Sequence, residues 1–218
     1  RFLLCHFFVI SLECVTNHPV SAQEVATAFR SWSKVGVEGA LPAGASFSAH
    51  QLFRTLSNGF PNRTISEGTV AVPLGSWEAE VELRYYWLGQ SLGELSEDQR
   101  GRVRINLERS RDLGTHTLSA RLGFQHRVAV VGASQEKSDF RARLRLAQPR
   151  PNQKWLYDVE WLSQPFGNQA QRLRGGAAVQ WRQSERWRLE TGYFYERNLN
   201  NTGPHFHSVT LFFTRKGE

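Results

Sequence analysis

The stretch from Trp77 to Trp87 alternates strictly between two kinds of residue. Its odd positions read Trp, Ala, Val, Leu, Tyr and Trp, and its even positions read Glu, Glu, Glu, Arg and Tyr. Because successive side chains of a β-strand point to opposite faces, this strand has one apolar, aromatic face and one charged face. At about 3.3 Å per residue and a tilt of about 40°, its two Trp residues lie about 25 Å apart along a barrel axis, which is the height of the apolar band of outer-membrane barrels. The stretch therefore predicts a membrane-spanning barrel strand.

The same alternation recurs along most of the chain after residue 31, and groups of turn residues separate the runs. In one run Arg141, Arg143 and Arg145 alternate with apolar residues. Such alternation is typical of strands with one apolar and one polar face. We therefore predict eleven strands, at residues 31–41, 44–54, 65–74, 77–88, 102–109, 116–130, 139–147, 155–162, 172–182, 187–197 and 205–214.

The connections between these strands fall into a shorter and a longer set, which alternate along the chain. The shorter connections are 42–43, 75–76, 110–115, 148–154 and 183–186, and the longer ones are 55–64, 89–101, 131–138, 163–171 and 198–204. Outer-membrane barrels have short periplasmic turns and longer extracellular loops. The pattern therefore predicts an all-β fold, an antiparallel transmembrane β-barrel of about 10–12 strands.

An odd number of strands conflicts with the even numbers found in bacterial single-chain barrels. We therefore expect ten or twelve strands rather than eleven. Either a short strand lies within residues 23–30, or one of the first three predicted strands is wrong.

The composition permits a barrel and argues against two other classes. No run after the first dozen residues approaches the ~18–20 apolar residues that a membrane helix needs. The mean hydropathy of −0.46 suits a barrel, because half of each strand faces a polar interior. A pI near 9.9 also occurs in nucleic-acid-binding proteins, but here Lys and Arg are spread over many strands beside Asp and Glu. We expect no nucleic-acid partner.

The first residues, Arg1 to Leu12, read as a basic end followed by a mostly apolar run, which is typical of a secretory signal. Val20, Ser21 and Ala22 place small residues where a signal peptidase cleaves, so we predict a signal peptide at 1–22 and a barrel at 23–218. Both cysteines fall within the signal, which leaves the barrel without disulfide or thiol chemistry. The predicted location is the bacterial outer membrane, with membrane lipid and the barrel-assembly machinery as partners.

The charged faces of the predicted strands would line the barrel interior. Neighbouring strands carry opposite signs, an arrangement that favours cross-strand pairing. The residues predicted to face the lumen are Glu78, Glu80, Glu82, Arg102, Arg104, Arg141, Arg143, Arg145, Asp158, Glu160, Arg174, Arg182 and Glu190.

Two functions remain open for this interior. The pairs could fill and stiffen a narrow lumen, since unpaired buried charges are costly. Alternatively, the arginines could line a narrow pore that tolerates anions. A barrel of about 8 strands is filled by side chains and one of 16 or more leaves a channel, so 10–12 strands lie between the two. Under either interpretation we expect no catalytic residue, no metal and no cofactor.

Aromatic residues near the ends of the predicted strands would form the girdles at the membrane interfaces. These residues are Trp77, Trp87, Trp155, Trp161, Trp181, Trp187 and Tyr193.

Two alternatives compete with a non-enzymatic membrane barrel. A lipid hydrolase on the outer wall would need a Ser, a His and a group that orients the His, and His126, His205, His207 and Ser208 are the candidates. His126 would need a Ser from a neighbouring strand. A soluble periplasmic binding barrel would turn the apolar faces inward and the charges outward, and alternation alone cannot distinguish inside from outside.

Several short strand signatures resemble one known family, the bacterial outer-membrane proteins grouped as domain of unknown function 2490. The resemblance covers roughly residues 29–213. Its clearest parts are residues 141–146, 157–162, 171–175, 189–193 and 207–211, which read RARLRL, YDVEWL, QRLRG, LETGY and HSVTL. The resemblance implies an outer-membrane barrel of unassigned activity and supplies no catalytic residues.

Overall fold

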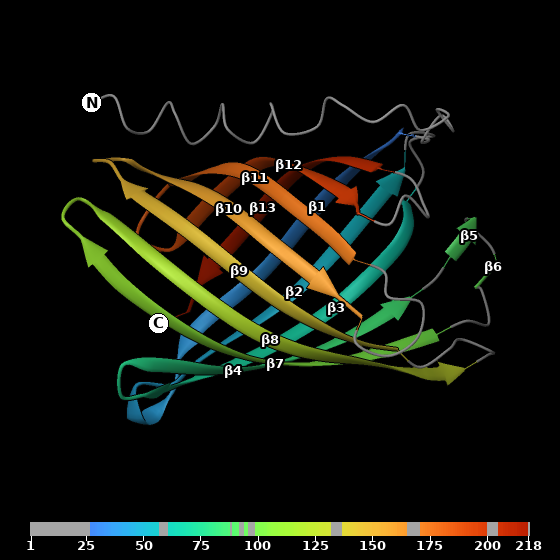
Figure 1. Cartoon of the computed structure of the whole chain (residues 1–218), viewed down its shortest axis with the longest axis horizontal. Coiled ribbons are helices and arrows are strands. Elements are labelled where there is room, and N and C mark those ends of the chain that lie inside the picture. The colour runs from blue at the N-terminus through green and yellow to red at the C-terminus, as the bar shows by residue number, and fades with distance from the viewer. Residues whose placement is uncertain are drawn as a thin grey trace.

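Eleven strands of the protein form one closed barrel in the computed structural model (Figure 1). The structure describes residues 27–56, 61–87, 89–91, 94–95, 99–131, 137–164, 171–199 and 205–217. The predicted signal peptide and much of the longer predicted connections lie outside these residues. Around the barrel the strands follow the order β1, β13, β12, β11, β10, β9, β8, β7, β4, β3, β2.

Each predicted strand is confirmed by one strand of the barrel. The bounds are β1 Thr27–Ala40, β2 Ser46–Leu56, β3 Pro61–Leu74, β4 Trp77–Trp87, β7 Gln99–Leu113, β8 His116–Val131, β9 Lys137–Pro149, β10 Gln153–Ser163, β11 Gln171–Arg182, β12 Trp187–Asn198 and β13 His205–Lys216. A small two-stranded sheet, β5 (Gly89–Ser91) with β6 (Glu94–Leu95), lies within the predicted 89–101 connection. This sheet was not predicted.

The expectation of ten or twelve strands is wrong for the part of the chain that the structure describes, where the barrel closes with eleven. An odd number closes because β1 and β13 run parallel, in register from Thr27 opposite His205 to Glu38 opposite Lys216. All other neighbouring strands of the barrel are antiparallel. Two-residue alternation is the same for a parallel and an antiparallel neighbour, so the sequence pattern does not show how the barrel closes.

Tight turns gather at one end of the barrel (Figure 1). We call this the turn end, and the opposite end, where β2, β4, β8, β10 and β12 end, the loop end. A 3-10 turn, Pro42–Gly44, joins β1 to β2, and Gly75 and Gly114 lie in the turns after β3 and β7. The φ angles of Gly44, Gly75 and Gly114 are 75°, 63° and 65°. Glycine adopts this left-handed region without strain, which explains its use at these reversals.

The apolar faces point outward and the charged faces point inward. In β4, Val81 and Leu83 are 46% and 57% exposed, whereas Glu82 between them is 5% exposed. The largest buried side chains likewise include the polar Gln125, Glu196 and Asp139. A soluble barrel with an apolar core requires the reverse arrangement. Among the described residues no helix has the length and apolar character needed to cross a membrane.

Candidate functional site in the barrel lumen

The barrel encloses a cavity of about 900 Å³ that is lined by side chains from both ends of the strands. Arg63, Arg100 and Arg127 line it at the loop end, and Lys154 and Arg188 at the turn end. Side chains therefore narrow the lumen without filling it.

The inward faces of β3, β4 and β7 to β10 form what we call the charged wall. Its first centre is Glu82, whose carboxylate accepts a hydrogen bond from Nη1 of Arg104 at 2.8 Å. Nε of Arg84 lies 2.6 Å from the same carboxylate, and Nη2 of Arg102 lies 3.5 Å from it. Arg84 also contacts the carboxylate of Glu67 on β3. Charges taken out of water are stable only when paired in this way, so the centre joins β3, β4 and β7.

A second centre joins β9 and β10 to the neighbouring strands. Glu160 pairs with Arg141 on one side and with Nη1 of Arg174, at 3.1 Å, on the other. Arg174 also pairs with Glu196 on β12, with 2.5 Å between Nη2 and the carboxylate. Nη1 of Arg172 lies 3.3 Å from the same carboxylate. The pairs form a chain of alternating charge across four strands.

Smaller pairs occupy the turn end of the charged wall. Arg145 donates two hydrogen bonds to Asp158, from Nε at 2.7 Å and from Nη2 at 3.0 Å. Arg143 Nη2 lies 3.1 Å from Glu108. The carboxylates of these pairs are more exposed than those of the two centres, with 27% for the side chain of Asp158 and 17% for that of Glu108, against 9% or less in the two centres. Water screens such pairs, so they contribute less to stability.

The opposite side of the lumen, formed by β11, β12, β13, β1 and β2, has small inward residues between its ends. We call it the small-residue wall after Gly36, Ser48, Gly176, Ala178, Gly192 and Thr210, which alternate there with larger inward side chains such as Lys34, Leu52 and Phe194. A Cβ atom on Gly176 would lie 2.7 Å from both Phe194 Cβ and Tyr193 O. A Cβ on Gly192 would lie 2.7 Å from Ala178 Cβ. Close packing between neighbouring strands thus requires glycine here, and the small side chains leave space in the lumen.

Cations on β1 and β2 lie against aromatic rings that also face the lumen. The guanidinium of Arg54 lies 5.6 Å from the ring centre of Trp32, and Lys34 Nζ lies 4.7 Å from that of Phe212. Arg30 lies over the ring of Phe206. Cation–π contacts hold a cation in place without neutralising its charge.

Positive charge in the lumen is concentrated in the half nearer the loop end. Arginines there outnumber carboxylates more than twofold, whereas the two signs are nearly balanced in the half nearer the turn end. The loop-end set comprises Arg30, Arg54, Arg63, Arg84, Arg100, Arg102, Arg104, Arg127, Arg141, Arg172 and Arg174 with Glu67, Glu82, Glu160 and Glu196.

Most residues predicted to face the lumen lie on the cavity wall. They are Glu80, Glu82, Arg102, Arg104, Arg141, Arg143, Arg145, Asp158, Glu160, Arg174 and Glu190. Glu78 and Arg182 occupy inward positions of the alternation at the turn end, where both are exposed beyond the main cavity. Glu78 borders a smaller recess of about 480 Å³, and Arg182 is opposite Arg188 on β12.

Sequence reasoning missed several inward residues that complete the network. Glu67, Glu108, Glu196, Arg84 and Arg121 take part in ion pairs of the lumen. All of them occupy polar positions of the alternation, which was the available signal. Their partners depend on strand register, and alternation leaves register open.

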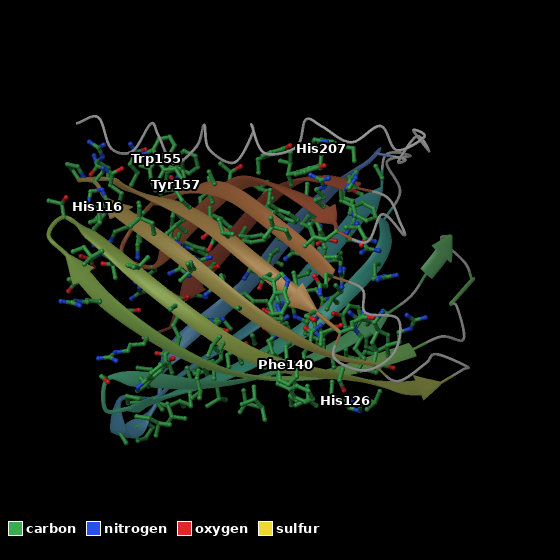
Figure 2. All side chains as sticks on the ribbon, viewed as in Figure 1. His116, His126, Phe140, Trp155, Tyr157 and His207 are labelled. Atoms are coloured by element: carbon green, nitrogen blue, oxygen red, sulfur yellow. The ribbon has the colours of Figure 1, made fainter. Side chains whose placement is uncertain are left out.

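The aromatic residues predicted for the membrane interfaces all occupy outward positions of the alternation. Trp77, Trp155, Trp181 and Trp187 lie at the turn end, and Trp87 and Trp161 lie at the loop end. Tyr193 differs, since it is midway along β12. Figure 2 shows Trp155 and His116 near one end of the barrel and His126 and His207 near the other. Trp32, the remaining Trp, faces the lumen.

The structure separates most of the candidate hydrolase residues. His205 and His207 occupy outward positions, whereas Ser208 points inward and is fully buried. His126 Nδ1, by contrast, lies 2.9 Å from Ser138 Oγ on the neighbouring strand β9. Within the described residues no carboxylate forms an ion pair with His126, and no group of three or more His, Cys, Asp or Glu could hold a metal ion.

No family model matches the chain, and no curated protein matches it. Among solved structures, the chain aligns with an anion-selective porin from Comamonas acidovorans, at 15% identity and a TM-score of 0.38. The alignment covers 80% of this chain and 55% of the porin, so the chain spans about half the length of that protein. The resemblance to domain of unknown function 2490 stays a prediction.

Proposed function

We propose that the protein is an outer-membrane β-barrel that provides a narrow, anion-tolerant passage and performs no catalysis. One observation carries the proposal. The lumen holds a cavity lined by side chains from both ends of the strands, and its positive charges outnumber its negative ones at the loop end. Charged linings determine which ions a pore accepts. Positive charge at the mouth would attract anions, while the ion pairs of the charged wall keep the barrel rigid around them.

The outward face supports the membrane location. Along the described strands its charged residues are all arginines, namely Arg109, Arg111, Arg197 and Arg215. They lie toward strand ends, and two of them lie over Trp rings: Arg109 is 5.7 Å from the ring centre of Trp77, and Arg215 is 5.8 Å from that of Trp187. Trp and Arg side chains near strand ends are typical of the boundary between the hydrocarbon core and the lipid headgroups. Membrane lipid would cover the apolar band, and the barrel-assembly machinery would insert the chain.

A depth-dependent substitution tests this location. Ile105 pairs with Val81, which lies between Trp77 and Trp87, and both side chains point outward. We expect Ile105→Arg to lower the free energy of unfolding from lipid vesicles by about 2–4 kcal/mol, and Leu113→Arg, at the turn end, by about 0–1 kcal/mol. Equal effects of the two variants, or a protein that stays folded and soluble without detergent, would rule out the membrane location.

Planar-bilayer recording of the refolded protein tests the passage itself. Discrete current steps are expected, with small conductance because the cavity is narrow. If a correctly folded barrel, verified by heat-modifiable migration on gels, never gives steps, its role is structural.

A second function is favoured by the 2.9 Å contact between His126 and Ser138 on the outer wall. A base beside a hydroxyl is the minimum arrangement for ester hydrolysis. We therefore retain a lipid hydrolase as the alternative. Phospholipid hydrolysis by refolded protein in mixed micelles, abolished by both Ser138→Ala and His126→Ala, would establish it. Absence of hydrolysis above a heat-denatured control would exclude it.

A further inference from the structure

Arginines face one another directly across several strand pairs near the loop end. Arg54 of β2 is opposite Arg63 of β3, and Arg102 of β7 is opposite both Arg84 of β4 and Arg127 of β8. Like charges directly opposite one another in a sheet destabilise it. The arrangement therefore needs a source of compensating negative charge.

The nearby carboxylates supply only part of this charge. Arg127 Nη2 lies 3.0 Å from Asp139, and Glu82 is shared among Arg84, Arg102 and Arg104. Glu196 is already paired with Arg172 and Arg174. Three carboxylates are thus shared among six guanidinium groups, so they do not neutralise all of the positive charge at this end.

Arg63 and Arg102 each have a buried donor that no described residue satisfies. Nε of Arg63 and Nε of Arg102 are buried and have no hydrogen-bond partner within the part of the chain that the structure describes. Arg63 lies within the repulsive fields of Arg54, Arg100 and Arg127. The guanidinium of Arg102 lies 5.4 Å from the ring centre of Tyr86, and Tyr86 itself lies near Arg84 and Arg127. An unsatisfied buried donor costs free energy comparable to that of a lost hydrogen bond, and a bound anion would remove this cost.

We propose that Arg54, Arg63, Arg100, Arg102 and Arg127, which we call the arginine belt, bind a multivalent oxyanion of the phosphate or sulfate class that enters from the loop end. The proposal rests on the proposed function and names the substrate class for the same lumen. Guanidinium groups match tetrahedral oxyanions because they donate paired hydrogen bonds in a fixed plane. A monovalent, spherical chloride ion satisfies fewer of these donors and compensates less charge.

Two kinds of measurement test the belt, and the first needs no conduction. Titration calorimetry of the refolded protein with inorganic pyrophosphate should show saturable binding, which weakens as salt is added. We expect Arg63→Gln to weaken it about tenfold, the loss of one charge-assisted hydrogen bond. Arg111→Gln, on the outer face at the turn end, is the matched control and should bind like the parent. Sulfate in place of pyrophosphate distinguishes general oxyanion binding from a preference for phosphate.

Thermal unfolding separates a binding role from a structural one. Without pyrophosphate, Arg63→Gln should unfold at the same or a higher temperature than the parent, because it relieves repulsion. With pyrophosphate, the parent should gain stability and the variant should gain less. A variant that is less stable without the anion, together with equal pyrophosphate affinity in parent and variant, would overturn the proposal.

The second measurement is the effect of pyrophosphate on chloride current in bilayers. Addition at the loop end should reduce the current, and Arg63→Gln should weaken the block. Chloride current without any binding of pyrophosphate contradicts the belt and leaves the passage intact. Binding of pyrophosphate by a barrel that never conducts contradicts the passage and leaves the belt intact.

Discussion

The two sides of the lumen differ in how they use the same barrel geometry. The charged wall places long side chains inward and joins them in ion pairs such as Glu82 with Arg104 and Glu160 with Arg141. The small-residue wall places Gly176, Ala178 and Gly192 at the corresponding positions of β11 and β12. Backbone hydrogen bonding of the sheet is continuous across both. The difference indicates that the long, ion-paired side chains of the charged wall stabilise the barrel. The small side chains of the small-residue wall leave space in the lumen.

The largest stability effect is expected on the charged wall. Glu160→Gln leaves Arg141 and Arg174 without the carboxylate they share, and breaking a buried pair costs about 3–5 kcal/mol. Asp158→Asn is the matched control, two residues away on the same face of β10, where Asp158 is more exposed and pairs with Arg145. It should cost about 1 kcal/mol or less. Denaturant titration from detergent or vesicles measures both, and equal losses would contradict the distinction between buried and screened pairs.

The small-residue wall should instead govern conduction. Ala178→Trp places a large ring in the cavity and should reduce single-channel conductance by more than half. Val179→Trp, the next residue on β11, points to the outside of the barrel and should leave the conductance unchanged. Similar currents from both variants would show that the open part of the lumen does not lie along this wall.

An effect smaller than that of Glu160→Gln is expected from a polar contact between strands of the small-residue wall. Gln180 Nε2 donates a hydrogen bond to Glu190 at 3.0 Å, between β11 and β12. Gln180→Ala should lower the free energy of unfolding by about 1 kcal/mol, measured by the same titration. A loss as large as that of Glu160→Gln would mean that both walls brace the barrel equally.

Alternation was sufficient to predict the strands and to separate the two faces of each strand. The run from Trp77 to Trp87 is β4, which begins where the predicted strand 77–88 begins, and residue 88 lies outside the described residues. Parallel closure by β1 and β13 could not be predicted, since a parallel neighbour leaves the alternation unchanged.

Ion-pair partners could be predicted only where neighbouring strands carry opposite charges in matching register. Arg145 and Asp158, on neighbouring strands that carry opposite charges, are directly opposite one another. Glu78 is instead opposite Glu108. Register depends on turn geometry and on the shift between strands around a closed barrel, and these are properties of the whole sheet. The belt of opposed arginines is invisible in the sequence for the same reason.

The reversal potential of refolded protein in a planar bilayer, measured under a KCl gradient, tests the central claim most directly. The account predicts a potential whose sign reports anion selectivity, and a shift toward zero in Arg63→Gln because positive charge is lost at the loop end. Ala178→Trp should lower the conductance and keep the sign. A cation-selective current, or an unchanged potential in Arg63→Gln, would contradict an anion passage governed by the loop-end arginines.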